Sequence, residues 1–363
     1  MRRIDFLRKN GIIAMFFASD NWAGAHPKIA ESLALEAAGY AAAYGTSDLD
    51  RRMEERFNDL FQREVAVFFV GTGTAANSLA LAAVAKPGGV TFCHSEAHVT
   101  ADECGAPEFL TGACRLVPVH GPGGKMDKDA LTAAIGRFPP GAVHQGRPMA
   151  VTITQATESG TVYTLDEIEA IAAVARQNGL PLHMDGARFA NALVALDATP
   201  ADMTWKRGVD ILSFGATKNG CWCAEAIIFL KPELASEMPF IRKRSAQLFS
   251  KTRFISAQFE AYLEGGLWLD LARNANRMAD RLRAGIGAAT KSRLAWNTTT
   301  NEVFAVLTKD AAALAEGRGA KFYDWPVPAE APDLLQDDEM LIRLVTSFAT
   351  TEDDVDRFLD VLA

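Results

Sequence analysis

Three side chains that together could carry covalent chemistry follow two apolar runs of this chain. Lys218 comes after the run Val209–Phe214, and Asp185 and Arg188 come after the run Leu180–Met184. In open α/β sheets, ligands bind outside the carboxyl ends of the strands, so these groups are expected at one sheet edge. A lysine for a Schiff base, an acid beside a pyridinium nitrogen and an arginine for an anionic group suit a pyridoxal phosphate site.

Each of these residues also has an ordinary structural interpretation. A lysine after a strand is usually a solvated surface residue. Asp185 and Arg188 could form an exposed ion pair, worth roughly 0–1 kcal/mol. The occurrence of the acid and arginine after one apolar run and of the lysine after another favours the catalytic interpretation, because the ends of both runs would meet at one sheet edge.

A glycine-rich turn supplies a candidate phosphate site. The segment Gly71–Ala76 (GTGTAA) follows an expected strand and opens an expected helix, so its backbone N–H groups would attract a phosphate. The pattern G-x-G-x-x-A, with Glu96 roughly 20 residues beyond it, also fits a dinucleotide-binding unit. That alternative is weaker, because a long stretch of structured chain precedes the turn and because Asp185 and Lys218 stay unexplained.

Two histidines four residues apart, His94 and His98, lie among acids and cysteines. A helical His-x-x-x-His pair could hold zinc. The order is His-Ser-Glu-Ala-His rather than His-Glu-x-x-His, and the segment begins at a strand end, so we predict no metal site. One histidine laid over a cofactor ring explains the segment more simply, and a hydrogen-bonded surface position stays open as the alternative for His94.

The composition is that of an ordinary soluble globular protein. Of the 363 residues, 49% are hydrophobic and 23% are charged, and 37 basic against 45 acidic residues give a net charge of −8. General nucleic-acid binders are more often basic, so that class is disfavoured. Five cysteines without the spacing of a zinc or redox pair indicate a reduced, cytoplasmic protein. The basic start and the apolar stretch Gly11–Ala18 lack the cleavage site of an export signal, and no apolar run approaches the ~18 residues of a membrane span.

Helical and strand patterns alternate through the first two thirds of the chain, which predicts a mostly parallel sheet covered by helices. The expected helices are Ile29–Ala38, Asp48–Phe61, Thr74–Ala85, Lys128–Ile135 and Asp166–Asn178, and the expected strands are Val65–Val70, Val90–Cys93, Arg115–Val119, Met149–Thr154, Pro181–Met184, Val209–Phe214 and Ala224–Phe229. Near residue 255 the regular alternation of helices and strands ends. Helical sequence over Ser256–Ala289 is followed by expected strands at Glu302–Leu307 and Met340–Val345 and by a final helix. We therefore expect an N-terminal arm and large domain over residues 1–255 and a small domain over residues 256–363.

With these residues assembled, the chain resembles the low-specificity L-threonine aldolases, which are related to the β-eliminating lyases. The resemblance runs from Phe17 to nearly the end and includes Asn77 after the glycine turn. Its motifs are ASDN from residue 18, AYG from 43, HVTADECGAPEF from 98, TITQATE from 152, HMDGAR from 183, TKNG from 217 and IRLVT from 342. It implies an α/β protein of the pyridoxal phosphate-dependent transferase fold type I. Such a protein has a large domain with a mostly parallel seven-stranded sheet and a smaller C-terminal α+β domain.

The resemblance also implies roles for individual residues. Those at the cofactor are Lys218 as the Schiff base, Asp185 at the ring nitrogen, His98 stacked on the ring, Gln155 at the ring hydroxyl, Arg188, and Thr72, Gly73 and Thr74 at the phosphate. Those at the substrate are Ser19, Tyr44, Arg188 and Arg343, with His144 near the substrate hydroxyl. Gln155 stands where related chains often carry Asn, and Asp102 stands near a position that is aromatic in some relatives.

The implied reaction is the reversible cleavage of L-threonine, L-allo-threonine or a related β-hydroxy-α-amino acid, with phenylserine as a further candidate, to glycine and an aldehyde. His98, or a water held by His98 and His144, would be the base. β-Elimination or racemisation on the same lysine and aspartate, and a dinucleotide-binding module, remain alternatives. The family sends a segment like Lys251–Arg253 to the cofactor of a neighbouring subunit. Arg253 is therefore expected to complete a shared site in a dimer or a dimer of dimers.

Overall fold

The computed structural model describes residues 14–328 and 331–362. The chain divides into two compact units, a larger one of Ala25–Glu158 and Val162–Trp268 and a smaller one of Met1–Gly24, Ser159–Thr161 and Leu269–Ala363. The smaller unit therefore takes in residues from both ends of the chain. The basic start of the chain and the first residues of Gly11–Ala18, which bear on an export signal, lie outside the described residues.

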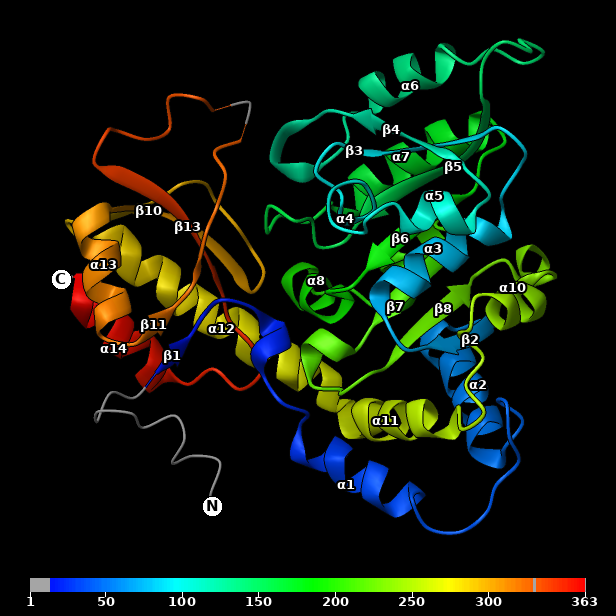
Figure 1. Cartoon of the computed structure of the whole chain (residues 1–363), viewed down its shortest axis with the longest axis horizontal. Helices are drawn as coiled ribbons and strands as arrows, with labels where there is room; N and C mark the ends of the chain where they lie inside the picture. Colours follow the sequence, from blue (N-terminus) through cyan, green and yellow to red (C-terminus); the bar gives the residue numbers. More distant parts are fainter. Residues whose placement is uncertain (1–13, 329–330, 363) are drawn as a thin grey trace. The chain divides into compact units, whose positions relative to one another are not determined.

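The larger unit is built on a sheet of seven strands in the order β2-β8-β7-β6-β5-β3-β4, which can be followed by the labels in Figure 1. β8 pairs antiparallel with β2 and β7, and the other pairs are parallel, so the prediction of a mostly parallel sheet is confirmed. The strands are β2 (Ala66–Val70), β3 (Gly89–His94), β4 (Arg115–Val119), β5 (Arg147–Thr154), β6 (Leu182–Gly186), β7 (Ile211–Gly215) and β8 (Glu225–Phe229).

Helices cover this sheet: α3 packs against β7 and β8, α6 against β3 and β4, α7 against β6, and α11 against β2. Capping boxes start α2 at Ser47 and α7 at Thr164, and the Thr72 side chain caps α3. The helices of the unit are α1 (Pro27–Glu36), α2 (Asp48–Phe61), α3 (Gly73–Ala83), α4 (His98–Ala101), α5 (Ala106–Leu110), α6 (Lys128–Gly136), α7 (Leu165–Gln177), α8 (Phe189–Leu196), α9 (Pro200–Met203), α10 (Met238–Arg244) and α11 (Arg253–Leu263).

The helical sequence expected to run from Ser256 to Ala289 is broken into α11 and α12 (Leu267–Ala288). Between them lies the short turn η8 (Glu264–Gly266), in which Gly265 and Gly266 have φ of 58° and 78°. Positive φ values are readily adopted only by glycine, so the Gly-Gly pair ends one helix and lets the next begin. The stretch expected to be helical therefore forms two helices, separated by this pair.

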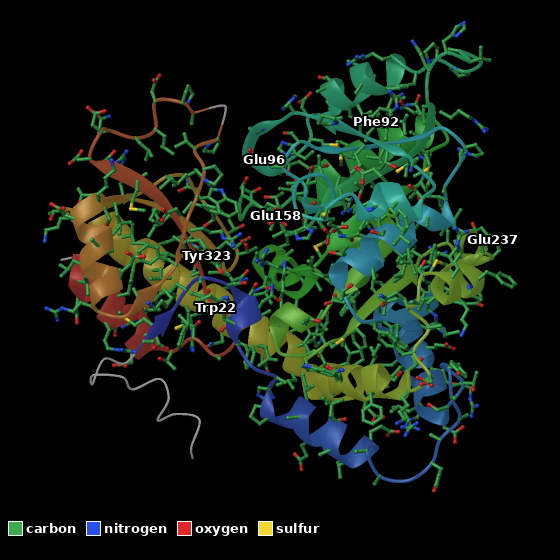
Figure 2. The ribbon with its side chains drawn as sticks, viewed as in Figure 1. Trp22, Phe92, Glu96, Glu158, Glu237 and Tyr323 are labelled. Atoms are coloured by element: carbon green, nitrogen blue, oxygen red, sulfur yellow. The ribbon has the colours of Figure 1, made fainter. Side chains whose placement is uncertain are left out.

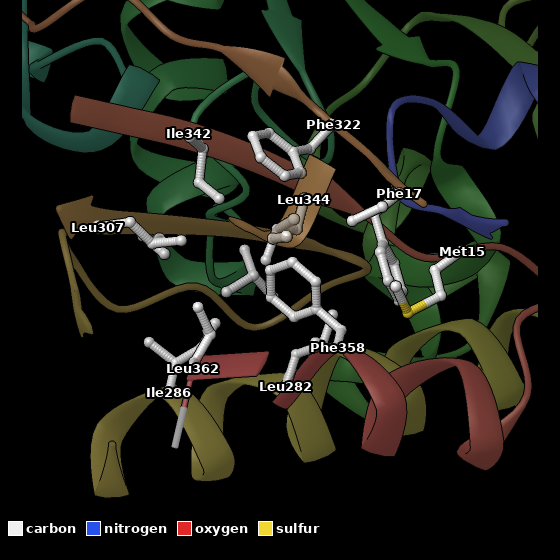
Figure 3. Close-up of a cluster of buried hydrophobic side chains, with 14 of the residues drawn as sticks. Met15, Phe17, Leu282, Ile286, Leu307, Phe322, Ile342, Leu344, Phe358 and Leu362 are labelled. Carbon is white, nitrogen blue, oxygen red and sulfur yellow. The ribbon is translucent and has the colours of Figure 1, made fainter. Parts of the chain in front are cut away.

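The smaller unit has a four-stranded antiparallel sheet in the order β12-β13-β10-β9 and a parallel pair of β1 with β11. Its core joins the start of the chain to its end, because Met15 and Phe17 pack in one cluster with Phe358 of the last helix (Figure 3).

No helix within the described residues is long and apolar enough to cross a membrane. The remaining elements are β1 (Met15–Phe16), β9 (Ser292–Leu294), β10 (Glu302–Thr308), β11 (Ala320–Lys321), β12 (Tyr323–Asp324), β13 (Glu339–Val345), α13 (Lys309–Gly317) and α14 (Glu352–Leu362).

Candidate active site

Asp185 lies on β6 near its carboxyl end and is 3% exposed. One carboxylate oxygen accepts a hydrogen bond of 3.0 Å from the backbone N–H of Ala187, and the other accepts one of 2.9 Å from the Asn77 amide. A buried carboxylate with a hydrogen bond to each oxygen has a fixed orientation, unlike an exposed acid that pairs loosely with a neighbour.

Lys218 is half-buried in η6 (Thr217–Asn219), the turn directly after β7. The next residue, Asn219, is buried and anchors this turn. Its side-chain amide donates to the hydroxyl of Tyr262 at 2.7 Å and to the carbonyl of Trp268 at 2.8 Å. These two hydrogen bonds hold the backbone that carries the Lys218 amine.

The ends of β6 and β7 approach closely because each ends in glycine. A Cβ added at Gly215 would lie 2.6 Å from the carbonyl oxygen of Ala187, and one added at Gly186 would lie 2.7 Å from that of Ser213. The two strands are parallel neighbours, with Asp185 opposite Ser213. The glycines therefore set the spacing of the strand ends that present Asp185 and Lys218.

His98 begins α4 and is linked to Asp185 through two other side chains. Its Nδ1 lies 2.9 Å from Oε1 of Glu103, and the same oxygen accepts a hydrogen bond of 2.8 Å from Nδ2 of Asn77. That Asn77 nitrogen is the one that also donates to Asp185. The sequence motif pointed to His98 and Asn77 but gave no role to Glu103, whose side chain is fully buried.

The surroundings of His98 raise the pKa of its imidazole. The hydrogen bond to Glu103 is the largest cause; burial lowers the pKa, the charges of Glu158 and Asp185 raise it, and the charge of Lys218 lowers it. Glu158 is labelled in Figure 2. Because all these charges act on His98, the larger unit brings together the imidazole, the amine and the acids at the carboxyl edge of its sheet.

The glycine turn lies between β2 and α3, as predicted. Thr72 is the N-cap of α3 and Gly73 and Thr74 form its first turn, where backbone N–H groups are available to an anion. A Cβ added at Gly73 would meet nothing within 4 Å, whereas one added at Gly71 would lie 2.9 Å from the ring of Phe249. The turn is therefore open on its helix side and closed against the protein at Gly71.

A further acid, Glu225 on β8, was missed from the sequence. It is buried in the larger unit, and burial raises the pKa of its carboxyl group to about 7, while Thr217 and the charge of Lys218 lower it. Its position in an apolar strand gave no signal of this proximity, because the pairing of β8 with β7 creates it.

Arg188 belongs to the group of site residues at the carboxyl edge of the sheet. Four other predicted residues of the larger unit have other surroundings: Tyr44, Arg253, Gln155 and His144. Arg188 is 5% exposed and is the N-cap of α8, directly after β6. Tyr44 is 50% exposed, and the Lys243 amine lies 5.4 Å from the centre of its ring. Arg253 forms an ion pair of 2.8 Å with Glu36.

Gln155 and His144 differ most from expectation. The Gln155 amide is fully buried, and its nitrogen and its oxygen each form a hydrogen bond of 2.9 Å with the backbone of Tyr163. His144 is exposed in a turn before β5. Since β5 and β6 are parallel, His144 lies at the amino edge of the sheet and Asp185 at the carboxyl edge, and the chain does not bring them together.

The other two predicted substrate residues belong to the smaller unit. Ser19 caps η3 (Asp20–Trp22), its hydroxyl accepting a hydrogen bond of 3.2 Å from the N–H of Asn21. Arg343 lies on β13, with its guanidinium carbon 4.2 Å from the centre of the Trp325 ring and a nitrogen 3.7 Å from Oε1 of Glu302.

The histidine pair does not form a metal cluster. Within residues 14–328 and 331–362, no group of three or more His, Cys, Asp or Glu side chains could hold a metal ion. His94 is instead engaged by the backbone, with Nε2 3.0 Å from the Gly121 carbonyl and Nδ1 accepting from the N–H of Glu96 at 3.1 Å.

Comparison with known proteins agrees with this geometry. Residues 17–310 match the family of beta-eliminating lyases. The chain belongs to that family. It is 40% identical to a low specificity L-threonine aldolase of a Pseudomonas species and 41% identical to one of Pseudomonas aeruginosa, in both cases over 85% of this chain and 88% of the relative.

A solved structure extends the similarity of this lyase-family chain to three dimensions. The threonine aldolase of Leishmania major superposes with a TM-score of 0.88 at 30% identity and covers 96% of this chain and 98% of its own. The fold is therefore that of the fold type I enzymes, as the motifs predicted.

Proposed function

We propose that this chain is a pyridoxal phosphate-dependent aldolase, which cleaves L-threonine and related β-hydroxy-α-amino acids to glycine and an aldehyde. The observation that carries the proposal is 40–41% identity, over 85% of the chain, to two proteins named low specificity L-threonine aldolase. The amine of Lys218, the carboxylate of Asp185 and the imidazole of His98 support it, because they are the groups that this reaction requires.

The described residues fit the cofactor. The first turn of α3 offers backbone N–H groups and open space at Gly73, which suit a phosphate. Oδ1 of Asn77 and Oε2 of Glu103 are buried without a hydrogen-bond partner among the described residues, which is typical of a site that receives a polar ligand. When bound, pyridoxal phosphate supplies an electron sink for the bond that breaks at Cα.

The chain's own residues divide the remaining tasks. Lys218 is the amine that would hold the cofactor, and Asp185 is the acid that would favour a protonated ring nitrogen. Arg188 is the cation of the larger unit that would bind the substrate carboxylate. His98 would take the proton of the β-hydroxyl group.

Several finer assignments stay predictions. They are the contacts of Ser19, Tyr44 and Arg343 with substrate, the substrate preference within the β-hydroxy amino acids, and a cytoplasmic location. Gln155 and His144 have the least support, because the first is engaged by the Tyr163 backbone and the second lies at the opposite sheet edge.

We also propose a homo-oligomer, a dimer or a dimer of dimers, in which Arg253 enters the site of a neighbouring subunit. In the single chain Arg253 pairs with Glu36, so entry would exchange that partner for a phosphate. Lys218→Ala and Arg253→Ala should each be inactive, and mixing them under subunit exchange should restore partial activity. An active monomer in sedimentation, or no restoration despite demonstrated exchange, would contradict the shared site.

The test of function is product analysis with purified protein. The protein loaded with cofactor should absorb at about 420 nm, and Lys218→Ala should lack this absorbance. L-Threonine should then yield acetaldehyde and glycine in equal amounts. An oxo acid with ammonia would indicate β-elimination instead, and D-allo-threonine would indicate racemisation, which inverts Cα alone. Either result without aldehyde would refute the aldolase proposal.

A further inference from the structure

Two side chains, Glu103 and Asn77, connect His98 to Asp185 through three consecutive hydrogen bonds. Nδ1 of His98 lies 2.9 Å from Oε1 of Glu103, Nδ2 of Asn77 lies 2.8 Å from that oxygen, and the same Nδ2 lies 2.9 Å from Oδ2 of Asp185. All four side chains belong to the larger unit, and Glu103, Asn77 and Asp185 are buried.

Counting donors and acceptors assigns the protons of this series. An amide nitrogen carries two protons, so Nδ2 of Asn77 gives one to each carboxylate. Glu103 therefore acts as an acceptor, and an ionised carboxylate only accepts. Burial raises the pKa of the Glu103 carboxyl group, and the hydrogen bonds to His98 and Asn77 lower it. When this carboxyl group is ionised, the proton between it and His98 is on Nδ1 of the imidazole, which leaves Nε2 with a free lone pair whenever the ring is neutral.

We propose that Glu103 is a positioning residue that holds His98 as the Nδ1–H tautomer, so that Nε2 is the atom that takes the β-hydroxyl proton. This inference rests on the proposed function. Nε2 gains the hydroxyl proton, the O–H electron pair becomes the second bond of the aldehyde C=O, and the Cα–Cβ pair stays with Cα. A proton added at Cα then gives glycine, so atoms and electrons balance.

The orientation and the charge of Glu103 have separate effects. Its hydrogen bond fixes the tautomer, as the buried acid does in a Ser-His-Asp triad. The same hydrogen bond is the largest cause that raises the pKa of His98; the charges of Glu158 and Asp185 also raise it, and burial and the charge of Lys218 lower it. Asn77 keeps the two buried carboxylates apart by placing a donor between them.

Two substitutions separate these effects. Glu103→Gln keeps an oxygen that can accept from both His98 and Asn77 but removes the charge. Glu103→Ala removes the acceptor as well. Asp210→Asn is a matched control, because Asp210 is also a buried acid of the larger unit, which accepts from the N–H of Leu182 at 2.8 Å.

The direct readout is ¹⁵N NMR of labelled histidine in the protein loaded with cofactor, with the His98 signal identified by its loss in His98→Gln. The wild type and Glu103→Gln should show the Nδ1–H tautomer, and Glu103→Ala a mixture. The pKa of His98 should be lower in Glu103→Gln than in the wild type, because an opposite charge is removed. Asp210→Asn should change neither quantity.

Kinetics supply the second readout. The acid limb of kcat/KM for L-threonine should move to lower pH in Glu103→Gln with the His98 pKa, while kcat in Glu103→Ala should fall by about 10²-fold, within the roughly 10²–10⁴-fold that a positioned base contributes. An Nε2–H tautomer in the wild type would overturn the inference whatever the substrate. The expected tautomer without aldehyde from any β-hydroxy amino acid would instead refute the proposed function, and with it the proton transfer to Nε2.

Discussion

Replacing Gly215 with alanine should separate the two strand ends that present Asp185 and Lys218. The added Cβ would lie 2.6 Å from the carbonyl oxygen of Ala187 and 2.7 Å from its Cα. Ordinary contacts of a Cβ begin at 3.4 Å, so the backbones must part by 3.4 − 2.6 = 0.8 Å. Both atoms that it meets belong to the backbone, so no side-chain rotation relieves the clash.

The expected cost follows from that displacement. Forcing extra atoms into a packed interior destabilises a protein by about 1–3 kcal/mol. Catalytic groups must be held within about 0.5 Å of their working positions, and a shift of about 1 Å can cost 10²-fold in rate. We therefore expect kcat/KM for L-threonine to fall by about 10²-fold in Gly215→Ala, with a lower midpoint of thermal unfolding.

Acetaldehyde release and thermal unfolding measure the two effects. Gly136→Ala is the matched control, because a Cβ at the end of α6 would meet nothing within 4 Å. Removing a helical glycine should leave kcat/KM unchanged and raise stability by up to about 1 kcal/mol. Wild-type activity and stability in Gly215→Ala would show that the strand ends do not depend on their close approach, and would refute the reasoning.

Three further substitutions test other parts of the structure. Burial raises the pKa of Glu225 to about 7 from an ordinary 4.5, so between these values the folded chain keeps a proton that the unfolded chain has lost, and stability falls as pH rises. Glu225→Gln should lack this loss of up to about 3 kcal/mol, so its unfolding midpoint should fall less than that of the wild type between about pH 4.5 and pH 7. Asn219→Ala removes two buried hydrogen bonds beside Lys218 and should lower the free energy of unfolding by about 1–3 kcal/mol. It should also weaken cofactor binding in a titration followed by absorbance, and wild-type affinity would contradict this. Trp325→Leu removes the ring that stacks on Arg343, a contact worth about 0.5–2 kcal/mol. The KM for L-threonine should therefore rise about 2- to 30-fold with little change in kcat. An unchanged KM would contradict a role of Arg343 in binding the substrate carboxylate.

The order of strands and helices in the larger unit could be predicted because its sequence is locally consistent. Helices such as α2 and α7 are amphipathic and carry capping boxes, and the strands are short apolar runs. The placement of Lys218 and Asp185 followed from the rule that parallel strands deliver their last residues to one edge. The Gly265-Gly266 break was visible in the sequence as a turn signal and was missed there.

Other parts of the site depend on packing between distant segments. In the sequence, nothing distinguishes Glu103 from the other acidic residues near His94 and His98. In the structure, α4 packs against α3, and Glu103 contacts Asn77, which is 26 residues away in sequence. Resemblance selected His144 and Gln155 by alignment with motifs, but a residue before a strand lies at the other edge from one after it. Whether an amide faces a ligand or a backbone likewise depends on the loop that passes it, here that of Tyr163.

Asn77 shows why the site is more than the sum of its charged residues. With both protons of Nδ2 donated, one to Glu103 and one to Asp185, this amide lets two buried acids stay close without sharing a proton. One acid can then act on a ring nitrogen and the other on the imidazole of His98. An aspartate at the same position would add a third negative charge and no donor, so the two functions would no longer be independent. The separation of the two acids is therefore a property of a neutral residue that a search for charged groups passes over.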